Sequence, residues 1–325
     1  MRTGLVLGAG GVLGSAWMVG ALAAVGDRVG RPLGEVDLVL GTSAGSVLGA
    51  ALRCAVTVPE LIAHQSGTYA DDVLPDIRTL ERETGDGRPP VPLPWIGSPR
   101  LLAAAAMAPR RMNPVIAVTG LLPVGRARMG SLVHVVDALQ IRIGVTADRW
   151  VSGPPLWVVA VDYDTGRRVV FGRAGAPPSS VADAVLASCS IPGWFVPKVI
   201  DGHRYIDGGV ASSTSLGLLA RPGAPALDEV FVLAPLASYD YDHPRDAVAV
   251  LERGVRRVIT RWLDREVRAV RATGTRVTVL TPGPADLAVM GGNLMNPRRR
   301  AQVLEASLDT SSASLARALN GQEVA

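Results

Sequence analysis

The sequence is poor in lysine, cysteine and aromatic residues. Lys198 is the only lysine, so the 33 basic residues are almost all arginines, and with 29 acidic residues the formal net charge is +4. So small an excess is not a binding signature by itself, although arginine-rich surfaces favour phosphate or anionic lipid. The two cysteines, Cys54 and Cys189, lie far apart within apolar segments. They match neither a metal-binding CxxC motif nor a disulfide framework, so we expect two buried free thiols.

Repeats of solenoid length and low-complexity tails are also absent, whereas apolar residues are plentiful. They make up 48% of the 325 residues, against 19% charged residues, which excludes a disordered chain and provides material for a large core. We expect one domain over residues 1–325, with a cap-like helical insertion at about residues 69–151, where proline and arginine are dense.

The N-terminal segment imitates a signal peptide or a membrane span, because Met1 and Arg2 precede a mostly apolar run to Val25. Its glycines would weaken a lone helix; they are Gly4, Gly8, Gly10, Gly11, Gly14 and Gly20. A strand, a glycine turn and a buried helix explain this composition better. We therefore expect a soluble cytoplasmic protein.

The first 55 residues contain one pattern twice: a short apolar strand, a glycine turn and a helix rich in small residues. The strands are expected at residues 5–7 and 36–40. Continuous apolar strands that alternate with helices are typical of an α/β fold, in which a mostly parallel central sheet is covered by helices on both faces. The sequence predicts this three-layer fold.

The rest of the chain continues the pattern. Beyond a short helix at residues 101–108, we expect hairpins with turns at residues 164–166 and 201–202, strands at 230–233 and 277–280, and a closing helix at 304–319. A long helix near residues 248–271 carries apolar residues at helical spacing and arginines on its other faces. We interpret it as an amphipathic surface helix with a solvated arginine face. It lacks the aromatic series of a nucleic-acid-binding surface.

The segment GTSAG, residues 41–45, lies where a predicted strand meets a predicted helix. In this context a GxSxG match indicates a nucleophile elbow, with flanking Gly41 and Gly45 allowing strand and helix to approach closely. The Ser43 hydroxyl would then be exposed at the sheet edge, and the Ala44 N–H would face a developing oxyanion. The alternative interpretation is a glycine turn with a capping serine.

The loop after the first strand offers a second oxyanion donor. It reads GAGGVLG over residues 8–14, and Gly10 and Gly11 can turn N–H groups outward without a side chain in the way. A dinucleotide-binding fingerprint is the competing interpretation. It fits less well, because Leu13 stands where that fingerprint needs glycine and Asp37 begins the second strand instead of ending it.

The base that activates the serine has two candidates. Asp207 follows a short strand and precedes Gly208 and Gly209, so its backbone can lie close to a neighbouring element, although the segment also fits an ordinary turn. His243 comes later in the chain, and the order Ser43, Asp207, His243 suits a hydrolase triad. It lies in a polar loop, however, where an exposed histidine needs no functional explanation. No motif surrounds the other three histidines, His64, His134 and His203.

Taken together, these segments resemble the patatin-like phospholipases. The resemblance rests on the glycine loop, on GTSAG, on ASCSIPG at residues 187–193 and on YIDGG at residues 205–209, in this order and spacing. It implies Ser43 as nucleophile, Asp207 as general base in a dyad without histidine, and Gly10 and Gly11 as the oxyanion loop. Supporting glycines of the same motifs are Gly8, Gly14, Gly41, Gly45, Gly208 and Gly209. In two departures, Ala9 replaces a glycine and Leu13 stands where the family commonly has arginine or lysine.

We therefore expect a serine acyl hydrolase that acts on lipid or phospholipid esters without metal or cofactor. Asp162 and Asp164 share a predicted turn with no nearby histidine, so they make a poor metal site. The insertion, with Trp95, Met107 and Met112, is expected to form or cap the acyl pocket. The arginine helix predicts weak, salt-sensitive contact with anionic membranes. The alternatives are a non-catalytic lipid-binding protein on the same fold and a triad esterase.

Overall fold

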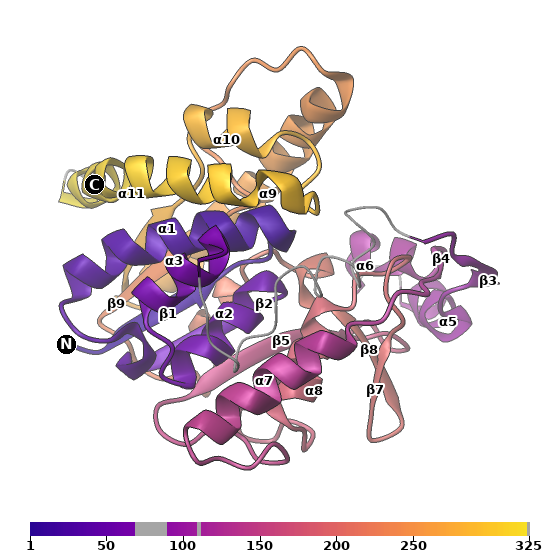
Figure 1. Cartoon of the computed structure of the whole chain (residues 1–325). Helices are drawn as coiled ribbons and strands as arrows, with labels where there is room; N and C mark the ends of the chain where they lie inside the picture. Colours follow the sequence, from indigo (N-terminus) through magenta and orange to yellow (C-terminus); the bar gives the residue numbers. More distant parts are fainter. Residues whose placement is uncertain (69–89, 109–111, 324–325) are drawn as a thin grey trace.

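The computed structural model describes residues 1–68, 90–108 and 112–323, and a central sheet organises them (Figure 1). The strand order is β10-β9-β1-β2-β5-β8-β7, with β6 paired to β5 beside this path. Five strands run parallel: β10 (Arg276–Leu280), β9 (Glu229–Leu233), β1 (Thr3–Leu7), β2 (Leu38–Thr42) and β5 (Leu156–Asp162). The antiparallel strands are β6 (Arg168–Phe171), β7 (Lys198–Ile200) and β8 (His203–Asp207). The prediction of a mostly parallel sheet with two hairpins is confirmed.

The register around β5 determines where the chemistry can occur. Thr42 at the end of β2 pairs with Val159, and the next residue of β5, Ala160, pairs with Asp207 at the end of β8. The residues that follow β2 and end β8 therefore lie on either side of one central strand. Every residue of β1, β2 and β5 is buried, as expected for strands covered on both faces.

One face of the sheet is covered by several helices, which lie in front of it in Figure 1. They are α1 (Gly11–Val29), α2 (Ala44–Arg53), α3 (Val58–Ser66), α7 (Gly130–Arg142), α8 (Val181–Cys189) and α11 (Arg300–Glu323). Alternate strand residues such as Leu5, Leu7 and Val39 point to this side and form one core with the helices.

The opposite face is covered by α9 (Ala247–Arg271) and the short helix η3 (Leu216–Ala220). Val6, Leu38 and Val232 point to this side and pack with Leu263 and Val267 of α9. Outside the predicted insertion, the described residues also form η1 (Leu33–Glu35), η2 (Gly208–Val210), α10 (Pro284–Met290) and η4 (Pro297–Arg299). Helices thus cover both faces, as the sequence predicts.

The predicted insertion contains α5 (Pro99–Met107), α6 (Pro114–Thr119) and α7, with a small sheet of β3 (Leu93–Ile96) and β4 (Pro123–Val124). In Figure 1 this small sheet, α5 and α6 lie to one side of the main body, whereas α7 runs along α8. Residues 69–89 and 109–111 lie outside the described residues. The insertion is thus partly helical, and one of its helices belongs to the main helical layer.

Helix α1 is long and apolar enough to cross a membrane, and no other helix in the described part of the chain passes this test. In the structure, 61% of its tested window is buried. The Ser307 hydroxyl of α11 donates to the Trp17 carbonyl at 2.7 Å, which ties the helix to its neighbour. Its apolar composition is therefore that of the predicted core helix.

Both thiols are free and buried, as predicted. Burial raises the pKa of Cys54 to about 12, so this thiol is unreactive at neutral pH.

Candidate active site

Ser43 occupies the turn between β2 and α2 with backbone angles φ 54° and ψ −124°. A positive φ at a residue other than glycine stores about 1–3 kcal/mol of strain. The Ser43 side chain makes no capping hydrogen bond to α2, so its hydroxyl is not used as a helix cap. The geometry is typical of a nucleophile elbow and contradicts the alternative of a capping serine.

The glycines on either side of Ser43 are required by close backbone approach. A Cβ on Gly45 would lie 2.0 Å from the Leu7 carbonyl oxygen, and one on Gly41 would lie 2.5 Å from the Ser46 Cα. No side chain can be accommodated at such distances without moving β1 away from α2. These glycines therefore hold the elbow against the central strands.

Ser188 holds the strained backbone of the elbow in place, a role that the sequence did not reveal. Its buried hydroxyl accepts a hydrogen bond from the Ser43 N–H at 2.8 Å and donates to the Val159 carbonyl at 2.6 Å. The Ser46 hydroxyl donates to the Ser43 carbonyl at 2.6 Å. Both backbone groups of Ser43 are thus fixed by side chains, which offsets part of the strain.

Asp207 is the ionisable group of this site. Its side chain is 5% exposed, and its carboxylate accepts a hydrogen bond from the Gly209 N–H at 2.7 Å. Burial raises the pKa of Asp207 to about 6, although the neighbouring Ser43 hydroxyl and the Gly209 N–H act to lower it. The Asp207 N–H donates to the Ser190 carbonyl at 2.9 Å, so the segment that contains Ser188 also positions this residue.

The candidate oxyanion donors are the backbone N–H groups of Gly10, Gly11 and Ala44, which lie near Ser43. Gly11 begins α1 at φ 60°, a conformation that favours glycine, and lines the same cavity as Ser43 and Ala44. Among the residues that the structure describes, none accepts a hydrogen bond from the N–H of Gly10, Gly11 or Ala44. The Ala9 N–H, in contrast, donates to the Ser213 carbonyl at 2.7 Å. Gly10 does not line the cavity, so Gly11 and Ala44 are the better placed donors.

The remaining motif glycines also lie at points of close approach. A Cβ would be 3.0 Å from the Leu233 carbonyl oxygen at Gly8, 3.1 Å from a Pro235 carbon at Gly14, 2.3 Å from the Val159 carbonyl oxygen at Gly208 and 3.1 Å from the Ala9 Cβ at Gly209.

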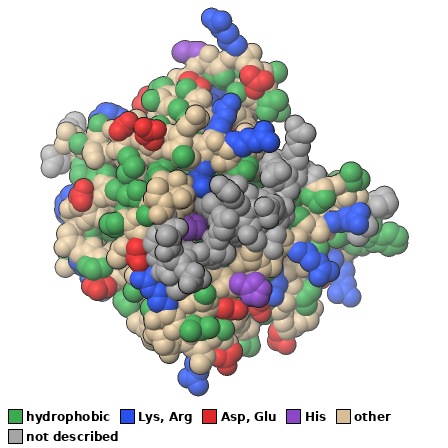
Figure 2. All heavy atoms as spheres, viewed as in Figure 1, with side chains coloured by type: hydrophobic (Ala, Val, Ile, Leu, Met, Phe, Trp, Pro, Cys, Tyr) green, Lys and Arg blue, Asp and Glu red, His purple; other side chains and the backbone are tan. Residues whose placement is uncertain are grey.

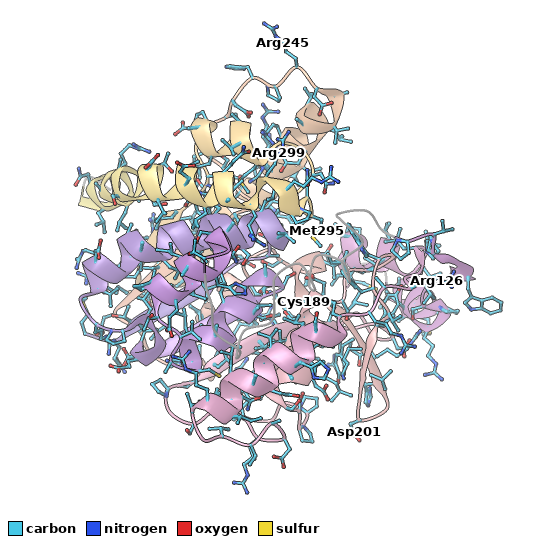
Figure 3. All side chains as sticks on the ribbon, in the orientation of Figure 1. Arg126, Cys189, Asp201, Arg245, Met295 and Arg299 are labelled. Carbon is cyan, nitrogen blue, oxygen red and sulfur yellow. The ribbon has the colours of Figure 1, made fainter. Side chains whose placement is uncertain are left out.

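A cavity of about 200 Å³ opens beside Ser43. Its wall is mostly apolar, with Val47 and Leu48 from α2 and Leu132, Val136 and Leu139 from α7. Polar side chains also reach it, namely His64, Gln65 and Arg300. Figure 3 labels Cys189 and Met295, which line the cavity from α8 and from the segment before α11. Such a cavity suits an apolar chain attached to a group that reacts at Ser43.

The insertion contributes to this cavity through α7 and not through the residues that the sequence favoured. Trp95 is 72% exposed and Met107 is 81% exposed, and neither lines the cavity. Met112 packs with Leu101 and Ile116 in a separate small core. The prediction for these three side chains is wrong, because β3, α5 and α6 lie to one side of the main body and away from the cavity of Ser43 (Figure 1).

The structure does not bring His243 to Ser43 and Asp207. His243 is exposed in the loop before α9 and lines a different, polar cavity with Asp242 and Arg253. His134 and His203 are also exposed. Among the described residues, His64 on α3 is the histidine that shares the cavity with Ser43, and no sequence motif pointed to it.

The two carboxylates weighed as metal ligands have structural partners. Asp162 accepts from the N–H groups of Asp164 and Thr165, each at 2.9 Å, and closes the hairpin turn. Asp164 pairs with Arg204 and accepts from the Ser98 hydroxyl at 2.9 Å. In the described ranges, no cluster of three or more potential ligands occurs.

Comparison with known proteins adds to this geometry. A family model described as "Patatin-like phospholipase" matches residues 5–220, more than half of the chain. The chain belongs to the patatin-like phospholipase family. This membership supports a lipid-hydrolase function. Strands β9 and β10 lie beyond the matched residues, yet they extend the same sheet.

Two solved structures illustrate the likeness. VipD from Legionella pneumophila aligns with a TM-score of 0.45 at 13% identity, over 97% of this chain and 67% of that chain. The type III effector protein ExoU aligns with a TM-score of 0.39 at 17% identity, over 98% of this chain and 53% of that chain. This patatin-like chain thus spans about two thirds of the first protein and about half of the second. At these TM-scores the likeness does not bear on function.

Proposed function

We propose that the protein is a serine acyl hydrolase that cleaves ester bonds of lipids through a Ser43–Asp207 dyad. The observation that carries the proposal is the Ser43 residue, which sits on a strained elbow, lies beside the buried Asp207 carboxyl whose pKa it lowers, and lines an apolar cavity. A carboxylate whose pKa is raised to about 6 is ionised at neutral pH and is also a stronger base than an ordinary aspartate.

The reaction follows from these positions. Asp207 accepts the proton of Ser43 as the Oγ atom bonds to the ester carbonyl carbon. The N–H groups of Gly11 and Ala44 hold the negative carbonyl oxygen, with Gly10 as a neighbouring donor. The tetrahedral intermediate expels the alcohol, which takes the proton from Asp207. Water then attacks the acyl-enzyme while Asp207 again accepts a proton. This proton passes to the Ser43 Oγ atom as its bond to the acyl carbon breaks, which releases the carboxylic acid and restores the enzyme.

The cavity supports an acyl substrate. Apolar walls from α2 and α7 favour a hydrocarbon chain, and the transferable carbonyl would lie at the end of the cavity occupied by Ser43. Phospholipids and neutral esters both carry such a chain, so hydrolysis of a panel of each identifies the head group.

A fluorophosphonate probe tests the proposal against a non-catalytic lipid-binding protein. Ser43 of the wild type is expected to gain one covalent phosphonyl group, visible as a single mass increment on the peptide that contains residue 43. Ser15→Ala provides a matched control, since Ser15 also lines the cavity but forms no hydrogen bond with Asp207. A folded protein that stays unlabelled, or labels at another residue, would support the binding protein instead.

The raised pKa of Asp207 predicts how the rate depends on pH. Below about pH 6 the carboxyl is protonated and cannot accept the Ser43 proton, so kcat/KM should rise about tenfold per pH unit up to this value and then level off. Histidine is the other side chain type that changes charge in this pH range, so the profile is measured in His243→Ala as well. A profile that flattens in that variant would contradict the assignment of the transition to Asp207.

A further inference from the structure

Helix α9 packs on the sheet in an orientation that leaves a row of its apolar side chains facing solvent. Val248, Leu251, Val255 and Val258 are 59%, 72%, 52% and 43% exposed. They are spaced three or four residues apart, so they form one continuous row along the helix. This row is hereafter the apolar row. The predicted solvated arginine face is present in four exposed arginines, but the structure also exposes this apolar row and buries Arg253 and Arg256, which the prediction placed with the solvated arginines.

Two arginines explain the orientation. Arg253 and Arg256 are only 2% and 1% exposed and point toward the protein. Arg253 forms a two-pronged pair with Asp242 and donates to the Leu287 carbonyl at 2.7 Å. Arg256 pairs with Glu252 and donates to the Pro235 carbonyl. Both buried guanidinium groups find carboxylate and carbonyl partners inside the protein, although the Nη2 atom of Arg256 has none in the described part of the chain. The first half of α9 therefore presents a polar side inward and an apolar side outward.

Four further arginines begin beside the end of the apolar row and continue along α9 beyond it. Arg257, Arg261, Arg265 and Arg268 are exposed and recur every three or four residues, so they line one flank of the helix. The three acidic residues of α9 are all engaged elsewhere: Glu252 with Arg253 and Arg256, Asp264 with the Tyr239 hydroxyl, and Glu266 with Arg168 and Thr214. Asp264 keeps its negative charge, because its partner is a neutral hydroxyl, so the flank carries four arginines against this one carboxylate and remains net positive.

The apolar row begins close to the candidate active site. A Cβ on Gly292 would lie 3.0 Å from the Val248 Cγ1, so the segment before α11 touches the start of α9. A few residues on, Met295 lines the cavity of Ser43, and its Sδ atom would be 2.7 Å from a Cβ on Gly11. In Figure 3, Met295 lies near the middle of the molecule, whereas Arg245 stands at the tip of the loop before α9. Figure 2 shows hydrophobic, basic and acidic side chains together at this end of the molecule.

We propose that the apolar row and its arginine flank form a docking surface for an anionic lipid bilayer. Apolar side chains of an interfacial helix enter the boundary between head groups and acyl chains, while arginines beside them reach the lipid phosphates. A second copy of the chain fits less well. Two such helices would place arginine against arginine, because α9 exposes four arginines while its Glu252 and Glu266 already pair with arginines of the same chain. The surface goes beyond the proposed hydrolysis, since α9 contributes nothing to the cavity.

The test is co-sedimentation of the Ser43→Ala protein with vesicles of phosphatidylcholine alone or with about a third phosphatidylserine, which measures binding without hydrolysis. We expect binding to the anionic vesicles that weakens at least tenfold from 0.05 to 0.5 M salt. Leu251→Asp with Val255→Asp should lower the partition coefficient at least tenfold. Arg261→Gln with Arg265→Gln should remove the preference for anionic vesicles.

Matched controls change equally exposed residues elsewhere: Val199→Asp for the apolar row, and Arg28→Gln with Arg149→Gln for the flank. These should bind like the parent. Thermal melts report the folding of every variant. Hydrolysis of a soluble ester by the same surface variants with Ser43 retained tests the proposed function separately. Unchanged binding in the Leu251/Val255 variant would overturn the proposal. So would a concentration-dependent dimer that this variant abolishes, which would assign the surface to a second copy.

Discussion

Replacing Ser43 by alanine is expected to lower kcat for ester hydrolysis about a thousandfold or more while leaving the protein folded. The hydroxyl makes no cap to α2, and the backbone of residue 43 stays fixed by Ser188 and Ser46. Alanine therefore removes the nucleophile and a polar neighbour of the Asp207 carboxyl, which changes the free energy of unfolding by no more than about 2 kcal/mol.

The measurement is kcat on a soluble p-nitrophenyl ester, with a thermal melt of the same sample. Ser15→Ala serves as the control, because it removes a hydroxyl from the same cavity without touching the elbow, and it should stay within about threefold of the wild type. Retention of more than about a tenth of kcat in Ser43→Ala would rule out this serine as the nucleophile.

The sequence predicts those parts of this site that depend on neighbouring residues, and it does not predict those that depend on how separate strands pair. The elbow is local, since Gly41 and Gly45 are needed wherever a strand and a helix cross so closely, and this pattern was visible in five residues. The contact between Ser43 and Asp207 is not local. It requires Thr42 and Asp207 to pair with adjacent residues of β5, and this register is fixed only by the folded sheet.

Other features were missed for related reasons. The Ser188 hydroxyl bridges the backbone of Ser43, after β2, and that of Val159 in the neighbouring strand β5. These three residues are far apart in the sequence, so no motif spacing reveals the bridge. For α9, periodicity identified an apolar side but not the direction in which it points. That direction depends on Asp242 and the Leu287 and Pro235 carbonyls, which supply partners for buried arginines.

Asp207→Asn is expected to lower kcat/KM by two or more orders of magnitude while making the protein more stable at neutral pH. Asparagine keeps the shape of the side chain but cannot accept the Ser43 proton. The stability gain follows from the raised pKa of Asp207, since ionising a buried carboxyl costs free energy that the neutral amide avoids.

The direction of this stability change can be checked by measuring unfolding at several pH values. The unfolded carboxyl ionises near 3.8 and the folded one at about 6, so the wild type loses stability as pH rises through this window and Asp207→Asn does not. The variant should be more stable by up to about 3 kcal/mol at pH 8 and by much less at pH 4. If the stability difference between Asp207→Asn and the wild type were the same at pH 4 and pH 8, Asp207 would not be a buried carboxyl with a raised pKa.

The dyad is tested most directly by comparing kcat/KM of Asp207→Asn, His243→Ala and His64→Gln on one soluble ester at pH 8. His243 lies in a separate cavity and His64 shares that of Ser43, so the two variants remove the remote and the near histidine in turn. We expect a loss of a hundredfold or more in Asp207→Asn, and both histidine variants within about threefold of the wild type. A hundredfold loss in either histidine variant, with its fold intact, would make an imidazole the base and contradict the dyad.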